Sequence, residues 1–152
     1  MADLVTNIGK GRFIYYADAV ENTGANEALV AVVLEASGLE ADDALQDYDT
    51  LSALLAGAST EQTTMGRKTL AGVTVTVDDT GNTASFDASD VTWTAATGNA
   101  TGKLVVCYDP DTTGGTDADL IPLTIHDFAV TPDGTDITVQ IDANGLATSS
   151  NA

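Results

Sequence analysis

The chain has 152 residues, enough for one domain that holds its core without a metal or a disulfide. It carries 23 acidic and 5 basic residues, and this net charge of −18 excludes direct binding to nucleic acid, whose phosphates need cations. No segment approaches the roughly 20 apolar residues of a membrane span, and no signal peptide is visible, so we expect synthesis in a cytoplasm without a membrane partner. The acidic surface is explained by solubility, by adaptation to a high-salt habitat or by complementarity to a basic partner.

Residues 1–12 are mixed in character and predict a flexible N-terminal arm. Gly9 and Gly11 flank Lys10, and glycine loses much backbone freedom when it becomes ordered. Lys10 and Arg12 are two of the five cations, so the arm is either a docking element or a frayed terminus. Residues 13–17, which are aromatic and β-branched, then predict a strand.

The next two patterns lie at residues 27–36 and 46–57. The apolar run from 29 to 34 fits a buried strand or a helix at this length, and its three valines favour a strand. The second segment predicts one short helix at about residues 46–56, capped by Asp47 or Asp49 and ended by Gly57 in a left-handed conformation. The apolar stripe of this helix consists of Leu45, Tyr48, Leu51 and Leu55.

From Arg67 onwards the chain alternates between strand and turn patterns. Residues 72–77 and 90–95 alternate apolar and polar side chains, as half-buried strands do, and residues 84–87 fit a return strand. Residues 104–108 form an unbroken apolar run, which indicates a strand buried on both faces, and residues 120–128 predict the next strand. Two further strands, at 128–130 and 137–141, are joined by a turn that contains Pro-Asp-Gly.

Short strands at regular spacing predict a mainly β fold, an antiparallel sandwich or barrel with the one short helix packed on it. The expected organisation is the flexible arm at 1–12, a single β-rich domain at 13–142 and a loose tail at 143–152. Trp93 lies on one face of an alternating strand and is either a core residue or an interface anchor. Cys107 lies in the most apolar run, so we expect a buried, unreactive thiol.

The residues carry no catalytic or cofactor motif, so we expect no enzyme activity and no cofactor. His126 is the one histidine, and adjacent strand residues point to opposite faces, so Asp127 does not orient it as a catalytic base. One histidine and one cysteine are too few for a zinc site.

Calcium is the one metal alternative that the sequence leaves open. Its candidate ligands, in a single loop, are Asp109, Asp111, Asp117 and Asp119. This loop begins like an EF-hand but has Leu120 where an EF-hand has its bidentate glutamate, and no helical pattern flanks it. A solvated acidic turn is the competing interpretation.

Several stretches together resemble one group of proteins. They are SGLEADDALQDYDTL (37–51), LLAG (54–57), RKTL (67–70), VTVTVDD (73–79), VTWTAA (91–96), GKLVVCYDPDTTGGTD (102–117), IPLT (121–124) and HDF (126–128). This set is similar to small virion proteins of tailed bacteriophages, particularly those of actinobacterial hosts. The resemblance extends from about Tyr15 to Ile141 and carries no catalytic motif.

The resemblance implies a virion structural protein on the capsid surface, most specifically a capsid decoration (cement or minor capsid) protein. Such a protein binds the expanded shell of the major capsid protein, often as a homotrimer, and stabilises it. Candidate contact residues are Lys10, Arg12, Arg67 and Lys68, together with the loop at 109–119. One alternative is a tail-tube, head–tail connector or fibre component. Another is a carbohydrate- or calcium-binding β-sandwich module.

Overall fold

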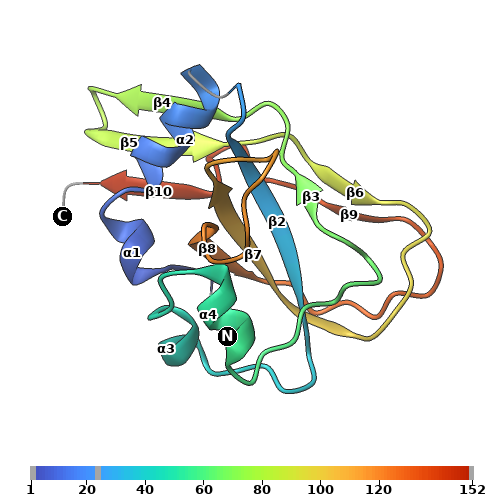
Figure 1. Ribbon diagram of the computed structural model, residues 1–152. Coiled ribbons are helices and arrows are strands. Elements are labelled where there is room, and N and C mark those ends of the chain that lie inside the picture. Colours follow the sequence, from blue (N-terminus) through green and yellow to red (C-terminus); the bar gives the residue numbers. More distant parts are fainter. Residues whose placement is uncertain (1–2, 23–24, 151–152) are drawn as a thin grey trace.

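The computed structural model describes residues 3–22 and 25–150, and within them the strands form three antiparallel sheets (Figure 1). The five-stranded sheet has the spatial order β1 (Leu4–Val5), β8 (Ile121–Asp127), β7 (Thr101–Asp109), β2 (Ala28–Glu35) and β3 (Lys68–Thr69). The three-stranded sheet has the order β10 (Ala147–Ser150), β5 (Thr83–Asp87) and β4 (Thr74–Asp78). The third sheet pairs β6 (Val91–Trp93) with β9 (Ile137–Val139). The expected mainly β, antiparallel sandwich-like fold is confirmed.

The two central strands, β2 and β7, are the apolar runs in which the sequence does not alternate. They pair antiparallel, with Val32 opposite Val105, and nearly every residue of both is buried. Successive side chains point to opposite faces, so Leu29 and Val33 join one core cluster while Val32 joins the other. The lack of alternation follows from having a core on each side of the sheet.

Trp93 and Cys107, which lie in predicted strands, are both buried in the core. Trp93 is 2% exposed, its indole N–H donates to the carbonyl of Gly66 at 2.9 Å, and its ring packs against Phe128. The core interpretation of Trp93 is therefore confirmed. Cys107 is fully buried, and this burial raises the pKa of its thiol far above the usual value.

Four helices lie in the described residues: α1 (Asn7–Lys10), α2 (Phe13–Asn22), α3 (Asp42–Leu45) and α4 (Leu51–Ala56). None of them has the length and apolar character needed to cross a bilayer. The strand predicted at 13–17 is wrong, because this segment opens α2. Phe13, Tyr16 and Ala17 are its buried residues, and their spacing of three and four is that of a helix face.

The helix predicted at 46–56 starts later and is capped differently. Its cap is Thr50, whose hydroxyl accepts the N–H of Ala53 at 3.2 Å, so neither Asp47 nor Asp49 holds this position. Leu45 belongs to the separate turn of helix α3. Gly57 follows α4 with φ −74°, so the predicted left-handed stop is also wrong.

Both ends of the described chain are paired into sheets, which corrects the expected flexible arm and loose tail. In the arm, Leu4 lies opposite Ile125 of β8. In the tail, Ala147 lies opposite Phe86 of β5. The expected strand at 128–130 is absent from the described elements, where β8 ends at Asp127. Two-residue and four-residue strands carry too little pattern to be seen in sequence, and their tertiary partners decide their structure.

Candidate docking surface

Helix α1, which leads into the corner with α2, is fixed to the body of the fold through its N-cap residue, Thr6. This residue is fully buried, and its hydroxyl donates to the carbonyl of Pro122 at 2.6 Å while accepting the N–H of Gly9 at 3.0 Å. The backbone N–H of Asn7 donates to the carbonyl of Gln46 at 2.8 Å. The segment that precedes α2 is therefore held against β8 and the end of α3.

Two cations project from this fixed corner. Lys10 and Arg12 are both exposed. The ammonium of Lys10 donates to the Asn7 side chain at 2.9 Å, and the guanidinium of Arg12 lies 3.4 Å from the Tyr16 hydroxyl. Among the described residues, no carboxylate forms an ion pair with either cation. Both charges are thus available to a partner.

An exposed aromatic ring lies beside the two cations. The Tyr15 side chain is 68% exposed, because the buried stripe of α2 runs through Phe13, Tyr16 and Ala17 and leaves Tyr15 outside it. A hollow of about 200 Å³ is lined by residues 10–15 and by Ser149 of β10. We call Lys10, Arg12, Tyr15 and Ser149 the docking surface.

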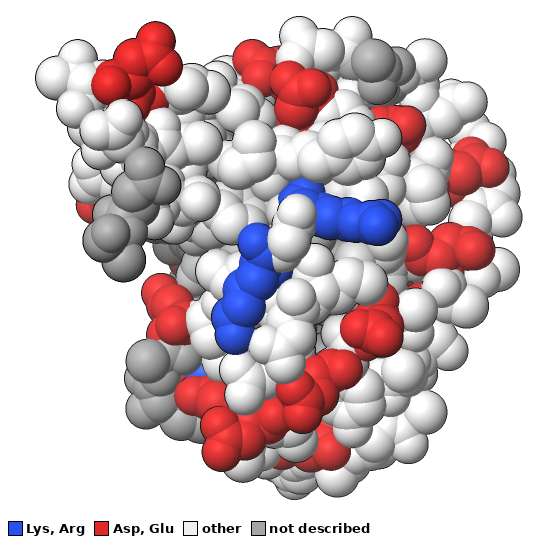
Figure 2. All heavy atoms as spheres, turned by 90° about the vertical axis from the view of Figure 1, so that its left-hand side faces the viewer, with Lys and Arg blue, Asp and Glu red and all other residues white. Residues whose placement is uncertain are grey.

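Figure 2 looks onto the side of the molecule where α1 and the end of β10 lie. Cationic side chains lie together near the middle of this face, and acidic side chains lie around them. Opposite charge at the centre of an otherwise acidic face favours one orientation of a bound partner.

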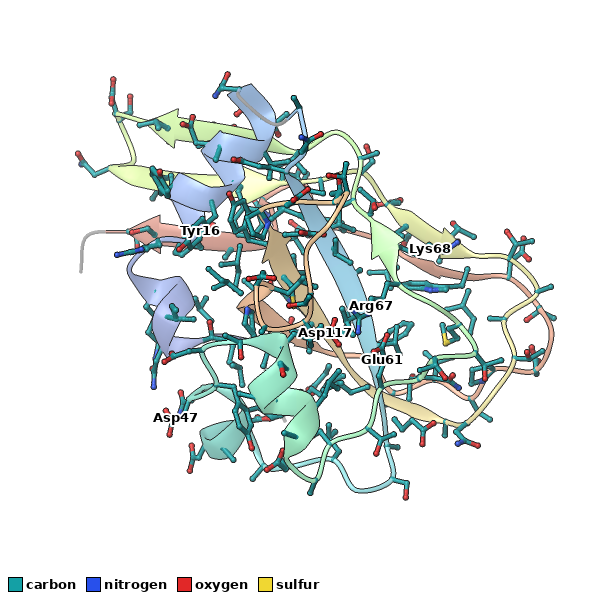
Figure 3. All side chains as sticks on the ribbon, viewed as in Figure 1. Tyr16, Asp47, Glu61, Arg67, Lys68 and Asp117 are labelled. Atoms are coloured by element: carbon teal, nitrogen blue, oxygen red, sulfur yellow. The ribbon has the colours of Figure 1, made fainter. Side chains whose placement is uncertain are left out.

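Arg67, a predicted contact residue, lies in an internal clamp (Figure 3). Its guanidinium binds both oxygens of Glu61, at 2.8 and 2.6 Å, and both oxygens of Asp117, at 2.6 and 3.0 Å. The hydrogen bonds to Glu61 and then to Asp117 raise the pKa of Arg67, and those from Arg67 lower the pKa of Asp117. The clamp joins the connector after α4 to the loop between β7 and β8.

The remaining two cations occupy different settings. Lys68 is half-buried on β3, and no described carboxylate forms an ion pair with it. Lys103 on β7 is fully buried, with its ammonium 2.7 Å from Asp127 and 2.9 Å from Asp42. Burial lowers the pKa of Lys103, but hydrogen bonds to these two carboxylates, and their charges, raise it further, so the ammonium form is favoured.

The four candidate calcium ligands do not converge on one point. Asp111 accepts the N–H and hydroxyl of Thr113, Asp119 accepts those of Thr116, and Asp117 binds Arg67. Asp109 accepts the N–H of Asp111. Within residues 3–22 and 25–150 no three acidic, histidine or cysteine side chains are grouped to hold a metal ion. The loop geometry supports the interpretation as an acidic turn.

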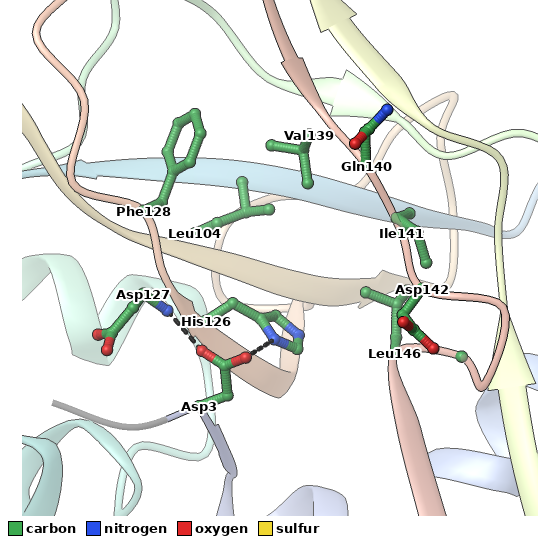
Figure 4. A pocket seen from close by; sticks show the side chains of 11 residues that line it. Asp3, Leu104, His126, Asp127, Phe128, Val139, Gln140, Ile141, Asp142 and Leu146 are labelled. Atoms are coloured by element: carbon green, nitrogen blue, oxygen red, sulfur yellow. Dashed lines mark hydrogen bonds and ion pairs between the residues drawn. The ribbon is translucent and has the colours of Figure 1, made fainter.

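His126 lies at a pocket of about 280 Å³ between β8 and the segment from β9 to β10 (Figure 4). Its Nδ1 is 3.3 Å from Asp3, whose other oxygen accepts the N–H of Asp127 at 2.7 Å. Burial raises the pKa of Asp3, but these hydrogen bonds lower it more, so its net pKa is below the usual value. The carboxylate beside His126 is thus Asp3, which the sequence did not indicate.

The second nitrogen of His126 lies 2.9 Å from the hydroxyl of Thr124. Aspartate, histidine and hydroxyl are the three groups of a nucleophilic triad. Thr124 is, however, fully buried and does not line the pocket, so this hydroxyl cannot reach a substrate there. The three groups tie the N-terminal segment to β8.

The sequence indicated Lys10 and Arg12 as contact residues but not their neighbours in space. Tyr15 was assigned to a strand, and Ser149 to a loose tail, so neither pattern placed them beside the cations. The helical spacing of Phe13, Tyr16 and Ala17 is the signal that would have placed Tyr15 on the outer face of α2. The chain matches no protein-family model, no curated protein and no solved structure.

Proposed function

We propose that this protein is a structural component of a tailed-bacteriophage virion, a capsid decoration protein that binds the expanded major capsid shell. The virion setting comes from the sequence resemblance between about Tyr15 and Ile141. The mode of action comes from the docking surface, and one observation carries it. Lys10 and Arg12 lie together beside the exposed ring of Tyr15, and no described carboxylate pairs with them.

This observation gains weight from the net charge of −18. A cation on such a protein is attracted to the protein's own carboxylates, and Arg67 and Lys103 each bind two of them. Lys10 and Arg12 instead face solvent next to an aromatic side chain, and arginine and tyrosine are enriched where protein surfaces bind each other. The partner surface that fits them is acidic at the point of contact.

A shell that gains its complete binding site on expansion is stabilised by mass action, because the decoration protein binds the expanded form. Binding as a homotrimer at the capsid surface would multiply this effect, since three linked docking surfaces act together. A tail-tube or connector protein would instead assemble with its own copies or occur in few copies. Copy number therefore separates the proposal from a connector, and self-assembly without a capsid shell separates it from a tail-tube protein.

The first experiment is quantitative mass spectrometry of purified virions of the phage that encodes this chain. The proposal expects hundreds of copies per particle. A handful of copies would indicate a connector or tip component instead. Absence of the protein from the virion would refute the proposal.

The second experiment measures co-sedimentation with expanded and unexpanded shells of the major capsid protein. We expect binding to expanded shells that weakens with salt, because surface charges are screened. Lys10→Glu combined with Arg12→Glu should weaken binding by about tenfold or more, equivalent to about 1.4 kcal/mol. Lys68→Glu is the control, because it reverses one cation on β3 outside the docking surface, and it should leave binding unchanged.

A further inference from the structure

The strand β10 has a free edge next to the docking surface. It lies at the outside of its sheet and pairs with β5 on one side. Among the described residues, no backbone hydrogen bond joins Thr148, Ser149 or Ser150 to a segment other than β5. Because hydrogen bonds of antiparallel strands alternate, alternate residues of β10 present their N–H and C=O groups to solvent.

The other outer strands of the described sheets are contacted by a helix or are shorter than β10, which has four residues, and β6 and β9 of the two-stranded sheet have three residues each. On β4, the opposite edge of the same sheet, the N–H of Val75 donates to the carboxylate of Glu21 in α2 at 2.9 Å. The outer strands of the five-stranded sheet, β1 and β3, have two residues each. The β10 segment Ala-Thr-Ser-Ser also lacks the lysine or proline that commonly protects an edge from pairing.

Two hollows border the free edge, and they differ in chemistry. Ser149 lines the hollow of the docking surface, beside Lys10, Arg12 and Tyr15. Ala147 lines a second hollow of about 160 Å³, whose other residues are Asp3, Leu4, Val5, His126 and Leu146. Residues two apart on a strand are about 7 Å apart and point to the same face. The hollows are therefore spaced like successive side chains on one face of an added strand.

We propose that the partner binds with an extended segment that pairs with the free edge of β10. An acidic side chain of this segment lies at Lys10 and Arg12, and an apolar side chain two residues away lies at Leu4, Val5 and Leu146. Backbone hydrogen bonds supply affinity in such strand addition, and the two hollows supply specificity. This inference rests on the proposed function in that it describes how the partner uses the docking surface. A second copy of the chain fits less well, since it too carries −18.

Two synthetic peptides test the segment without the shell: acetyl-Thr-Asp-Thr-Leu-Thr-amide and its reverse, acetyl-Thr-Leu-Thr-Asp-Thr-amide. Nuclear magnetic resonance of the full-length protein should show shifts at the amides of Ala147–Ser150 with one peptide order at millimolar concentration, and weaker shifts with Lys in place of Asp. Unchanged β10 amides with both peptides would overturn the inference whether or not shells bind. A shift that grows with protein concentration in the absence of peptide would identify a second copy as the occupant and also overturn it.

Proline substitutions test the same edge in binding to expanded shells. Adjacent residues face opposite ways, so one of Thr148→Pro and Ser149→Pro removes a hydrogen bond to β5, and the other removes a free donor. The variant that keeps the wild-type melting temperature should bind shells about fivefold or more weakly, as expected for a lost backbone hydrogen bond. Thr148→Ala and Ser149→Ala are the controls, because they remove the side chain but keep the backbone N–H that proline lacks. Wild-type binding by the stable proline variant would contradict the inference.

Hydrogen exchange of the shell complex decides the case in which both proline variants unfold. Protection of residues 146–150 together with residues 10–16 supports strand addition. Protection of residues 10–16 without 146–150 would refute strand addition and leave the docking surface intact. Protection of neither segment would refute both proposals.

Discussion

Replacing Arg67 with methionine removes the centre of the clamp and keeps much of the side-chain volume. The guanidinium makes four hydrogen bonds of 2.6 to 3.0 Å, two to Glu61 and two to Asp117. Its loss leaves two carboxylates facing one another without a cation. Because these carboxylates belong to the connector after α4 and to the loop between β7 and β8, the two segments would separate.

The expected loss lies between those of exposed and buried ion pairs. Exposed pairs contribute about 0–1 kcal/mol, whereas breaking a buried pair costs about 3–5 kcal/mol. The side chains of Arg67, Asp117 and Glu61 are 30%, 42% and 13% exposed, so the clamp is partly screened by solvent. We therefore expect Arg67→Met to lower the free energy of unfolding by about 2 kcal/mol. For a chain of this length the melting temperature would fall by roughly 4–8 °C.

Urea unfolding followed by circular dichroism, together with calorimetry, would measure this loss. Lys68→Met is the control, since it removes the adjacent cation, which has no ion pair among the described residues, and should change stability by less than about 0.5 kcal/mol. A loss for Arg67→Met as small as that of the control would refute the structural role. If Arg67→Met weakened shell binding without changing stability, Arg67 would be a contact residue, as the sequence predicted.

Three further predictions concern the same elements. The hydrogen bonds from Arg67 lower the pKa of Asp117 in the folded state. Its stabilising contribution is therefore complete above the ordinary pKa of 3.8 and is lost as the pH falls through the lower folded pKa. In urea titrations the wild type should lose more stability than Asp117→Asn between pH 5 and pH 2. Gly9→Ala would place a Cβ 2.5 Å from the Leu123 carbonyl oxygen and should cost about 1–3 kcal/mol in thermal unfolding, whereas Gly11→Ala meets no atom within 4 Å and should be neutral. Cys107 should resist a thiol reagent in the native protein and react fully in denaturant, and rapid native reaction would show that β7 is not buried as described.

The centre of the fold could be predicted because its strands carry strong local patterns. The apolar runs of β2 and β7 have no polar face, which indicates burial on both sides. The alternation around Trp93 likewise placed the indole on one face of β6, and this face is the buried one in the structure. In these segments the local sequence pattern and the tertiary packing favour the same structure, so the pattern alone was enough to predict it.

The N-terminal third shows why the rest could not be predicted in this way. Residues 13–17 favour a strand by composition, and the helical spacing becomes clear when the segment is extended to Val20, which also packs on the core. Local propensity is a weak prior that packing overrides, and here the face formed by Phe13, Tyr16 and Ala17 decides the element. The pairing of Leu4 with Ile125 is a long-range contact, and no local pattern of two residues specifies its partner.

The candidate site was predicted in part, through its charges. The rarity of cations made Lys10, Arg12, Arg67 and Lys68 stand out as contact residues in the sequence. Which of them are available depends on where carboxylates lie in space, and the partners of Arg67 are six and fifty residues away along the chain. The surroundings of Lys10 and Arg12 depend on β10, more than 130 residues away.

The placement of the five cations follows from the electrostatics of an acidic chain. Two carboxylates that face one another need a neutralising charge, and Arg67 and Lys103 each bind two acidic side chains of the fold. Lys10 and Arg12 neutralise no described carboxylate, although the field of the protein attracts both. Because Thr6 fixes the segment that carries them, Lys10 and Arg12 stay away from the described carboxylates, and their two charges remain available at low cost in conformational entropy. An acidic partner then gains the attraction without ordering the site on binding, and this is the physical basis for placing the contact at this corner.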